Sequence, residues 1–334
     1  MSKRYEDNNN YIEVKGLKKY FPIHAGVLRK TAGHVKAVDG IDFTIRRGRT
    51  FGLVGESGCG KSTTGRAMLR LVQPTAGEFN FDGSSVFDAK KHELQLLRTK
   101  LQIIFQDPYS SLNPRLTVRE IVGEALMQHK LVANRKEMAD KVAEMISRCG
   151  LFPDQALRYP HQFSGGQRQR ICIARALVLN PSFVVCDEAV SALDVSIQSQ
   201  IINLLKDLQD EMGLTYLFIS HDLSVVKFIS DDVGVMYLGQ IVEYGTKEQI
   251  FENPMHPYTE ALLAAAPSFD PKARQLKKRM IIEGDVPSPA RPPLGCRFHT
   301  RCPYSVEMCS KVEPENKELE PGRFVMCHKA QGLF

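Results

Sequence analysis

The run GESGCGKST, Gly55 to Thr63, constrains the fold of this chain more than any other part of the sequence. It matches G-x-x-x-x-G-K-[ST] and lies between an apolar run, Thr50 to Val54, and a segment of helical character, residues 61–71. Glycines let backbone N–H groups turn toward phosphate oxygens, and the N-terminus of the following helix favours an anion. The order strand, glycine-rich loop and helix therefore predicts an α/β core that binds phosphate.

The parts of this loop have separate chemical roles. Lys61 would neutralise the β- and γ-phosphates of a nucleotide, and the Ser62 hydroxyl would bind Mg²⁺. Cys59 is interpreted as a small side chain that fills the loop, not as a redox switch. The residues predicted to bind the nucleotide here are Gly55, Ser57, Gly58, Cys59, Gly60, Lys61, Ser62 and Thr63.

A second pattern places two carboxylates at the end of a buried strand. In FVVCDE, which begins at Phe183, four apolar residues precede Asp187 and Glu188. Ligands bind at the carboxyl ends of the strands in open α/β sheets. We therefore expect Asp187 to support Mg²⁺ through water, and Glu188 to act as the general base toward the attacking water.

The run FSGGQRQR, Phe163 to Arg170, is a further candidate for anion binding. Its Ser-Gly-Gly opens a predicted helix and could offer backbone donors and a hydroxyl to an anion. Taken alone, the run is explained by a simple helix cap. Beside a phosphate loop that already serves the chain's own nucleotide, it suggests a nucleotide held by a partner subunit.

Strands and helices alternate around these motifs. Residues 11–54 are predicted as strands, and residues 107–167 as a helical insertion with helices at Thr117–His129 and Arg135–Cys149. From residue 168 onward, helices alternate with apolar strands, which predicts a mainly parallel sheet. Beyond residue 266 the sequence is loop-like and punctuated by prolines.

Together these motifs resemble the ABC ATPase family over nearly the whole chain. The resemblance implies an α/β fold with a RecA-like parallel-sheet core, an N-terminal antiparallel β subdomain and a helical subdomain at about residues 107–167. It implies an ATP-binding domain over residues 1–265 and a C-terminal extension over residues 266–334. ATP and Mg²⁺ are the ligands that it implies.

The resemblance also assigns roles to single residues. FSGGQ resembles the signature motif, which contacts the γ-phosphate across a head-to-tail dimer; its members here are Ser164, Gly165, Gly166 and Gln167. Asp194 lies in a run that resembles the D-loop of the same interface. Gln106, in IIFQDP, resembles the glutamine that couples Mg²⁺ to the transmembrane partner, and His221, in ISHD, resembles the histidine that contacts the γ-phosphate.

Two positions near the motifs need separate comment. Phe21 lies where the family places an aromatic ring against adenine, with Tyr20 as the alternative one residue earlier. The family usually has proline after the catalytic glutamate, whereas Ala189 stands here. Alanine restricts the backbone less than proline, so we expect a looser loop. Glu188 and His221 are both present, which predicts a site competent for hydrolysis.

Three stretches narrow the resemblance to ATP-binding subunits of oligopeptide or dipeptide importers. They are QDPYSSLNPR from Gln106, NPMHPYTEALLAAAP from Asn253 and GDVPSPARPPLGCRFHTRCPYSVEMC from Gly284. This resemblance implies two transmembrane permeases, a second and different ABC ATPase, an extracytoplasmic peptide-binding protein, and a peripheral location on the cytoplasmic side of the cell membrane. Importers of nickel complexes share much of the pattern and are the alternative.

The C-terminal extension contains a group of cysteines, namely Cys296, Cys302, Cys309 and Cys327. Thiolates are soft ligands that suit zinc or an iron–sulfur cluster. Tight C-x₂₋₄-C pairs, usual in structural zinc sites, do not occur here. Unliganded thiols are the third interpretation. Some relatives with this extension carry a [4Fe-4S] cluster, so the resemblance implies one bound by these cysteines.

Composition excludes several other classes of protein. A net charge of +6, from 44 Lys and Arg against 38 Asp and Glu, is too small and too evenly spread to indicate a nucleic-acid partner. No apolar run approaches the length of a membrane span, and the polar start MSKRYEDNNN predicts no signal peptide. A soluble, non-transport ABC ATPase is a second alternative. Such proteins usually have two nucleotide domains in one chain or a long coiled-coil insertion, whereas this sequence has one phosphate loop and no long heptad run.

Overall fold

The computed structural model describes residues 10–25, 30–265 and 284–334. The described residues form two compact units. The first unit comprises Arg46–Arg49 and Asp88–Ile219, and the second comprises Asn10–Ile45, Thr50–Phe87 and Ser220–Phe334. Each unit is described by itself.

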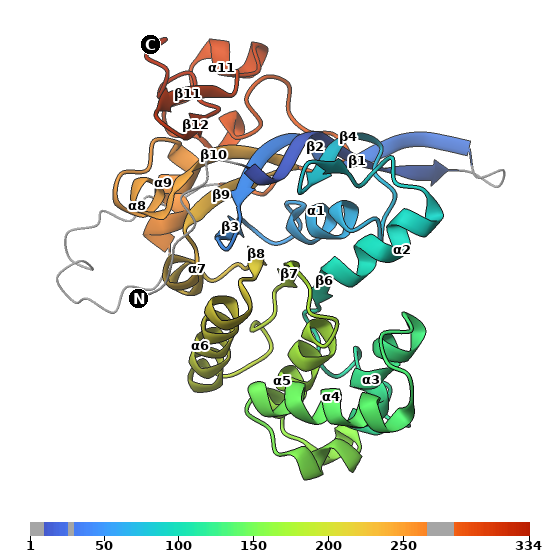
Figure 1. Ribbon diagram of the computed structural model, residues 1–334. Coiled ribbons are helices and arrows are strands. Elements are labelled where there is room, and N and C mark those ends of the chain that lie inside the picture. Colours follow the sequence, from blue (N-terminus) through green and yellow to red (C-terminus); the bar gives the residue numbers. More distant parts are fainter. Residues whose placement is uncertain (1–9, 26–29, 266–283) are drawn as a thin grey trace. The chain divides into compact units, whose positions relative to one another are not determined.

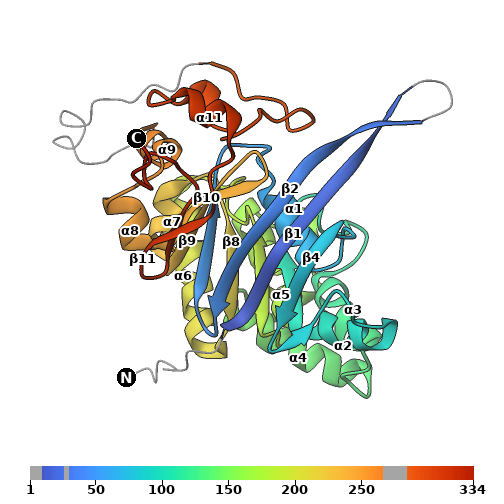
Figure 2. The same cartoon turned by 90° about the horizontal axis from the view of Figure 1, so that it is seen from above.

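An antiparallel sheet lies at the N-terminal side of the second unit. Its strand order is β2 (Lys30–Arg46), β1 (Asn10–Ala25), β4 (Ala76–Phe81) and β5 (Ser84–Ser85). Ile12 pairs with Phe81 and Val14 with Phe79, and all these side chains are buried. Figure 2 shows that β1 and β2 continue as a long ribbon beyond β4. The predicted N-terminal antiparallel subdomain is confirmed.

A second sheet of this unit contains the strand that leads into the phosphate loop. β3 (Thr50–Val54) is buried throughout and runs parallel to β9 (Asp232–Tyr237), in a register from Phe51↔Asp232 to Val54↔Val235. β10 (Gln240–Thr246) pairs with β9 in the antiparallel sense. The helices of the unit before the extension are α1 (Lys61–Met68), α7 (Leu223–Ile229), α8 (Lys247–Glu252) and α9 (Pro257–Ala265).

The first unit contains a parallel sheet that ends at the predicted carboxylates. β6 (Leu101–Ile104), β7 (Phe183–Asp187) and β8 (Thr215–Ile219) are neighbours in that order, and β7 and β8 are buried throughout. An apolar strand buried on both faces is typical of a parallel sheet. The helices that accompany these strands are α2 (Lys91–Lys100), α5 (Gly165–Leu177) and α6 (Val195–Met212).

The helical insertion of the first unit follows the prediction closely. α3 (Val118–Gln128) begins after Thr117, whose hydroxyl accepts from the Glu120 N–H, and α4 (Arg135–Arg148) begins after Asn134, which caps two N–H groups. Short 3₁₀ helices follow at Pro153–Leu157 and Pro160–Gln162. α3 and α4 pack closely, because a Cβ at Gly123 would come within 2.2 Å of the Met138 sulfur.

The extension contains more regular structure than its loop-like sequence predicts. Over residues 284–334 it forms a 3₁₀ turn at His299–Arg301, α11 (Glu307–Lys311), β11 (Lys317–Glu320) and β12 (Arg323–Val325). β12 pairs with β10, so the extension adds strands to the sheet of the second unit (Figure 1). Most of these residues lie in loops, as predicted, but the two short strands were not predicted, because strand pairing over such short runs leaves little periodicity in the sequence. Residues 266–283, where the predicted domain boundary falls, lie outside the described residues.

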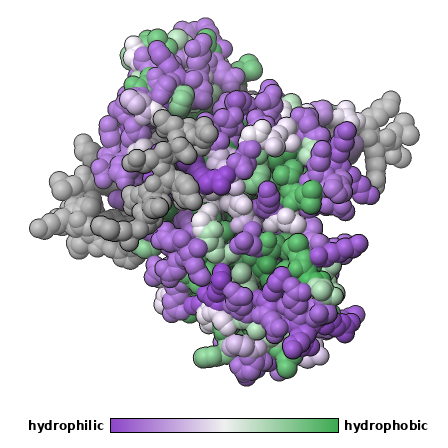
Figure 3. Space-filling model, in the orientation of Figure 1, coloured by the Kyte–Doolittle hydropathy of each residue, from purple (hydrophilic) through white to green (hydrophobic). Residues whose placement is uncertain are grey.

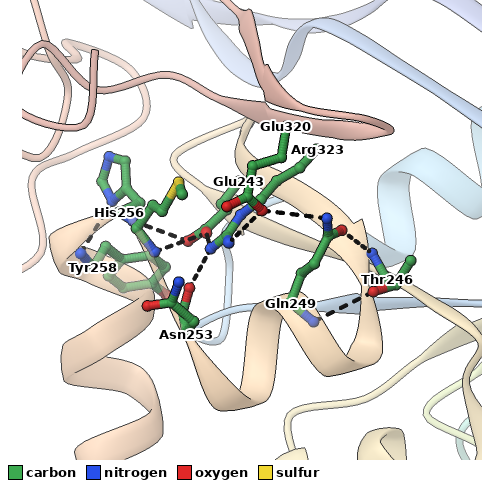
Figure 4. Close-up of polar contacts among 9 residues, drawn as sticks. Glu243, Thr246, Gln249, Asn253, His256, Tyr258, Glu320 and Arg323 are labelled. Carbon is green, nitrogen blue, oxygen red and sulfur yellow. Dashed lines mark hydrogen bonds and ion pairs between the residues drawn. The ribbon is translucent and has the colours of Figure 1, made fainter. Parts of the chain in front are cut away.

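A buried ion pair joins the extension to this sheet. Arg323, on β12, donates to Glu243 of β10 at 2.6 Å, and both side chains are fully buried. Arg323 also contacts Glu320 at 3.1 Å and the Asn253 carbonyl. The Glu243 carboxylate accepts the N–H groups of Met255 and His256, at 2.9 and 3.0 Å (Figure 4). Buried charges need partners of this kind, since an uncompensated one is strongly destabilising.

Polar side chains cover most of the face drawn in Figure 3, and apolar side chains form smaller patches on it. In the part of the chain that the structure describes, no helix combines the length and the apolar character needed to cross a bilayer.

Candidate nucleotide-binding site

The phosphate loop of the second unit is organised around Lys61. The Lys61 ammonium donates to the carbonyl oxygens of Gly55 at 2.8 Å and Glu56 at 3.0 Å, and the side chain is buried. Ser57 and Gly58 are exposed at the tip of the loop, and Ser62 is half-buried in the first turn of α1. The loop therefore surrounds a fixed positive charge and places a helix N-terminus beside it, as phosphate binding requires.

Two glycines of the loop cannot be replaced without a collision. At Gly55 a Cβ would lie 2.1 Å from the Met236 carbonyl oxygen, and at Gly60 it would lie 2.0 Å from that of Ala37. Their φ values, 151° and 114°, are also ones that other residues rarely adopt. Tertiary packing therefore requires glycine at these two positions, because the backbones of β9 and β2 lie against the loop.

Cys59 fits its predicted role as a filler. Burial raises the pKa of its thiol, against the opposing effect of Lys61. A neutral, buried thiol is a poor nucleophile and a poor target for oxidation.

The two candidate aromatics for adenine have different surroundings. The Tyr20 hydroxyl donates to Asp39, and burial together with this contact raises the pKa of the tyrosine to about 12. The Phe21 ring is 37% exposed, with the Lys19 ammonium 4.7 Å from its centroid. An exposed ring is the better platform for stacking, which favours Phe21.

His221 lies at the edge of the second unit. It stands between Ser220 and Asp222, the residue that caps α7 by accepting the Ser224 and Val225 N–H groups. Asp222 itself donates its N–H to the Ser220 hydroxyl at 3.0 Å. The His221 side chain is exposed, on a short turn held from both sides.

In the first unit, the structure brings the predicted general base and Gln106 together. The Gln106 amide nitrogen donates to Glu188 at 2.7 Å, although 82 positions separate them in the sequence. Asp187 is fully buried at the end of β7, and Glu188 is half-buried. Glu188 has a φ of 49°, a strained value for this residue, and donates its N–H to Ile219 at 3.0 Å.

The loop after Glu188 is held by hydrogen bonds. Ser191 donates both its N–H, at 3.1 Å, and its hydroxyl, at 3.0 Å, to the Glu188 carbonyl. The Gln198 side chain donates to the Val190 carbonyl at 3.0 Å. Ala189 and Val190 are buried. These contacts restrain a loop in which alanine stands where the family usually has proline.

The predicted signature motif is the N-terminus of α5. Ser164 caps the helix, accepting the Gln167 N–H, while the Gln167 side chain accepts the Ser164 N–H at 3.0 Å. A Cβ at Gly166 would come within 2.6 Å of Ile197 on α6, which explains the second glycine. Asp194 caps α6, because its carboxylate accepts a hydrogen bond from the Ile197 N–H. This hydrogen bond lowers the pKa of the Asp194 carboxyl. Both motifs therefore serve as helix caps within the first unit.

The four cysteines of the extension line one cavity. Cys296, Cys302, Cys309 and Cys327 share it with side chains that include His256 and His328. Burial raises the pKa of Cys296 to about 12 and also raises that of Cys302 and Cys327, while backbone N–H groups near these sulfurs act in the opposite direction. None of the four is in a disulfide. Among the described residues, however, no group of three or more His, Cys, Asp and Glu side chains is close enough to hold a single metal ion as it stands.

Sequence reasoning missed two residues that contact the phosphate loop. The Tyr258 hydroxyl accepts the Glu56 N–H at 2.9 Å, and Arg301 forms an ion pair with the Glu56 side chain. Both lie in stretches that resemble peptide importers, but nothing in those stretches predicts a contact with the phosphate loop, which lies more than 200 positions earlier. Only the spatial neighbourhood of the loop identifies them.

Comparison with known proteins identifies the family. A model of the ABC transporter family matches residues 38–191, and a model of the oligopeptide/dipeptide transporter C-terminal region matches residues 242–309. The oligopeptide transport ATP-binding protein AppF of Bacillus subtilis is 52% identical over 318 residues, 95% of this chain and 96% of that protein. The dipeptide transport ATP-binding protein DppF of Haemophilus influenzae is 48% identical, over 98% of this chain and 99% of that protein.

A solved structure shows the same architecture. The ATP-binding cassette MJ0796, in a dimeric post-hydrolysis state bound to ADP and Pi, superposes with a TM-score of 0.63 at 29% identity, covering 71% of this chain and 98% of that one. Fold and phosphate loop together define the class of P-loop nucleotide-binding proteins. The chain belongs to the ABC transporter family, with the ATPase cassette of that family followed by the oligopeptide/dipeptide transporter C-terminal region. The predicted family and fold class are confirmed.

Proposed function

We propose that this chain is the ATP-hydrolysing subunit of an importer for oligopeptides or dipeptides. One observation carries the proposal: the similarity to peptide-transport ATP-binding proteins extends over 95% of the chain and includes the extension. An importer of nickel complexes and a soluble ABC ATPase were the alternatives from sequence. The relatives named above favour peptides over both.

The resemblance to ABC ATPases gives the predicted residues separate roles in hydrolysis. Lys61 neutralises the β- and γ-phosphates, and the N–H groups of the loop and of α1 bind their oxygens. Glu188, oriented by its 2.7 Å contact with Gln106, takes a proton from the attacking water. His221 contacts the γ-phosphate, and Phe21 stacks on the adenine.

The proposed Mg²⁺ ligands have the right chemistry. Ser62 and Gln106 supply a hydroxyl and an amide oxygen, the hard donors that Mg²⁺ prefers, and the Asp187 carboxylate would support the ion through a water molecule. Because Gln106 donates to Glu188 through its nitrogen, its amide oxygen is the atom that remains for a cation. The bound ion would neutralise charge on the β- and γ-phosphates.

We further propose that ATP binding joins two such subunits. Ser164, Gly165, Gly166, Gln167 and Asp194 would contact the nucleotide of the partner subunit. The exposed Ser164 at a helix N-terminus supports this role, because such a position offers donors to an anion. ATP would shift the equilibrium toward the closed dimer, since it binds that state more tightly. We expect the partner to be a different ABC ATPase.

Permease subunits are the proposed membrane partners. The first unit exposes several large apolar side chains near its helical insertion, namely Tyr109, Phe152, Leu157 and Tyr159. Exposed apolar groups of this kind suit a protein–protein contact. We propose that two transmembrane permeases dock the subunit at the cytoplasmic face of the membrane, and that an extracytoplasmic binding protein delivers the peptide.

We also propose a [4Fe-4S] cluster as the ligand of Cys296, Cys302, Cys309 and Cys327. Four thiols on one cavity, with backbone N–H groups directed at three of the sulfurs, suit a cluster, whose thiolates are stabilised by such bonds. Four thiolates are a complete ligand set for such a cluster.

Iron and sulfide analysis of anaerobically purified protein tests the cluster. We expect a brown protein with about four iron and four sulfide per chain. Cys302→Ser should lower both together, whereas Cys149→Ser, a change at a buried cysteine of the first unit, should not. A colourless protein with one zinc per chain would overturn the cluster proposal.

Affinity purification from detergent-solubilised membranes tests the transport assignment. We expect two polytopic permeases, a second ABC ATPase and a peptide-binding protein to copurify with this chain. Recovery of ribosomal or DNA-bound proteins without a membrane partner would leave the ATPase chemistry intact and reject the importer.

A further inference from the structure

The segment between Cys296 and Cys302 reaches the phosphate loop. Arg301, the residue before Cys302, donates to both oxygens of Glu56, at 3.0 and 3.2 Å. Its side chain is 7% exposed and that of Glu56 is 26% exposed. The guanidinium also donates to the Tyr237 hydroxyl at 3.4 Å. This two-pronged geometry, partly shielded from water, is the strong form of an arginine–carboxylate pair.

Glu56 poses an electrostatic problem for a phosphate site. It is the second residue of GESGCGKST, and its backbone carbonyl accepts from the Lys61 ammonium at 3.0 Å. A carboxylate in this loop repels the β- and γ-phosphates, because like charges a few ångströms apart interact strongly in a partly buried site. Arg301 cancels that charge and holds the carboxylate on the side of the loop that faces the extension.

A second arginine of the same segment supports the other side of the loop. Arg297, the residue after Cys296, donates to the Leu238 carbonyl and to Asp39. Gly239, which follows Leu238 in the chain, donates its N–H to the carbonyl of Cys59 in the phosphate loop, at 2.8 Å. Arg297 thus restrains the turn between β9 and β10 that holds the loop, while Arg301 acts on the loop directly.

We propose that Arg301 is a positioning residue for ATP, through which the cysteine-bearing extension neutralises Glu56 and so sets the affinity of the phosphate loop for nucleotide. Arg297 assists by fixing the turn behind the loop. The proposal rests on the ATP-binding function proposed above. It makes the extension part of the nucleotide site of its own chain.

Removing the charge of Arg301 tests its role. In full-length protein, Arg301→Gln leaves Glu56 unneutralised, and we expect ATP to bind about tenfold more weakly by a fluorescent-nucleotide titration, through repulsion of the phosphates. In the assembled transporter the KM for ATP should rise by a similar factor with little change in kcat. Arg291→Gln, at an exposed arginine of the same extension, is the matched control and should bind like the wild type.

The double variant Glu56→Gln/Arg301→Gln separates electrostatics from packing. If Arg301 acts by cancelling the Glu56 charge, removing both charges restores ATP affinity to within about threefold of the wild type. A double variant as weak as Arg301→Gln alone would overturn the proposal. Should Arg301→Gln not fold, Glu56→Gln alone remains informative. It should bind ATP at least as tightly as the wild type, and a clear loss of affinity would overturn the proposal.

The titration also separates this inference from the proposed function. Wild-type protein that binds no ATP would reject the ATPase assignment. Wild-type protein that binds ATP, with Arg301→Gln binding equally well, would reject only the role of Arg301.

Discussion

The nucleotide motifs and the cysteine-bearing extension differ in how far apart in the sequence their interacting residues lie. The phosphate loop places its lysine, its donors and its glycines within one short run, and the strand that ends at Asp187 and Glu188 is equally local. The extension acts through single residues that meet distant partners, as Arg301 meets Glu56 across 245 positions and Arg323 meets Glu243 across 80.

This difference indicates which property a substitution in each region should change. A change within a motif removes a chemical group and leaves the fold, because its neighbours in sequence still form the same turn. A change in the extension removes one half of a buried pair and leaves the other half uncompensated. We therefore expect motif variants to lose chemistry, and variants of the fully buried Arg323–Glu243 pair of the extension to lose stability. The predictions below test this contrast, from the largest expected effect to the smallest.

Glu188→Gln should lose hydrolysis while it retains ATP binding. A general base contributes about 10²- to 10⁴-fold to a rate, so phosphate release should fall by that factor. The melting temperature should stay near that of the wild type. Glu124→Gln, at an exposed position on α3, is the control for removing a carboxylate from the first unit. Substantial residual activity in Glu188→Gln would remove Glu188 from the mechanism.

Arg323→Ala should show the opposite behaviour. It leaves Glu243 buried without its cation, and breaking such a pair costs about 3–5 kcal/mol of unfolding free energy, measurable by chemical denaturation. The N–H groups of Met255 and His256 still contact Glu243, which places the effect toward the lower end. Lys317→Ala, on the exposed strand β11, should change little. A stable Arg323→Ala protein would break the contrast between the two regions.

Gly60→Ala should sharpen the contrast, because it probes a motif residue that depends on tertiary packing. Its Cβ would lie 2.0 Å from the Ala37 carbonyl oxygen of β2, at a strained φ of 114°. Strain of this kind is worth about 1–3 kcal/mol, so ATP should bind roughly tenfold or more weakly. Gly213→Ala has a positive φ but open space around it, and should leave ATP affinity unchanged. Equal ATP affinity in Gly60→Ala and the wild type would refute the packing explanation.

Acid should lower the stability of the second unit through His256, which lies just before the extension and contacts Phe298 within it. Burial lowers the pKa of this histidine to about 3, and its Nδ1 accepts the Tyr258 N–H at 3.0 Å. Between that pKa and the usual value near 6.5, the unfolded chain binds the proton and the folded chain does not. The unfolding free energy should therefore fall by about 2 kcal/mol as the pH is lowered from 7 to 5. Denaturation of His256→Gln over the same pH range should show a shallower slope; an identical slope would assign the acid sensitivity elsewhere.

Particular residues show which parts of the structure could be predicted from the sequence. The sequence marks both ends of α6, because Asp194 is a good N-terminal cap and a glycine follows the last helical residue. Glu188 was identified from the strand before it. In contrast, α2 has no buried residue and β11 is a short exposed strand, so neither carries the periodicity on which a prediction depends. The roles of Tyr258 and Arg301 were missed for a related reason: a single polar residue has no pattern.

The sequence by itself determined the family, the phosphate loop, the position of the carboxylates and the presence of the cysteines. These features depend on residues that lie close together in the chain, and local geometry follows from local sequence. Only the tertiary structure decided that Gln106 orients Glu188, that the four cysteines face one cavity, and that Arg301 neutralises Glu56. Each of these is a contact between residues far apart in the chain, and its geometry is set by the packing of whole strands and helices between them.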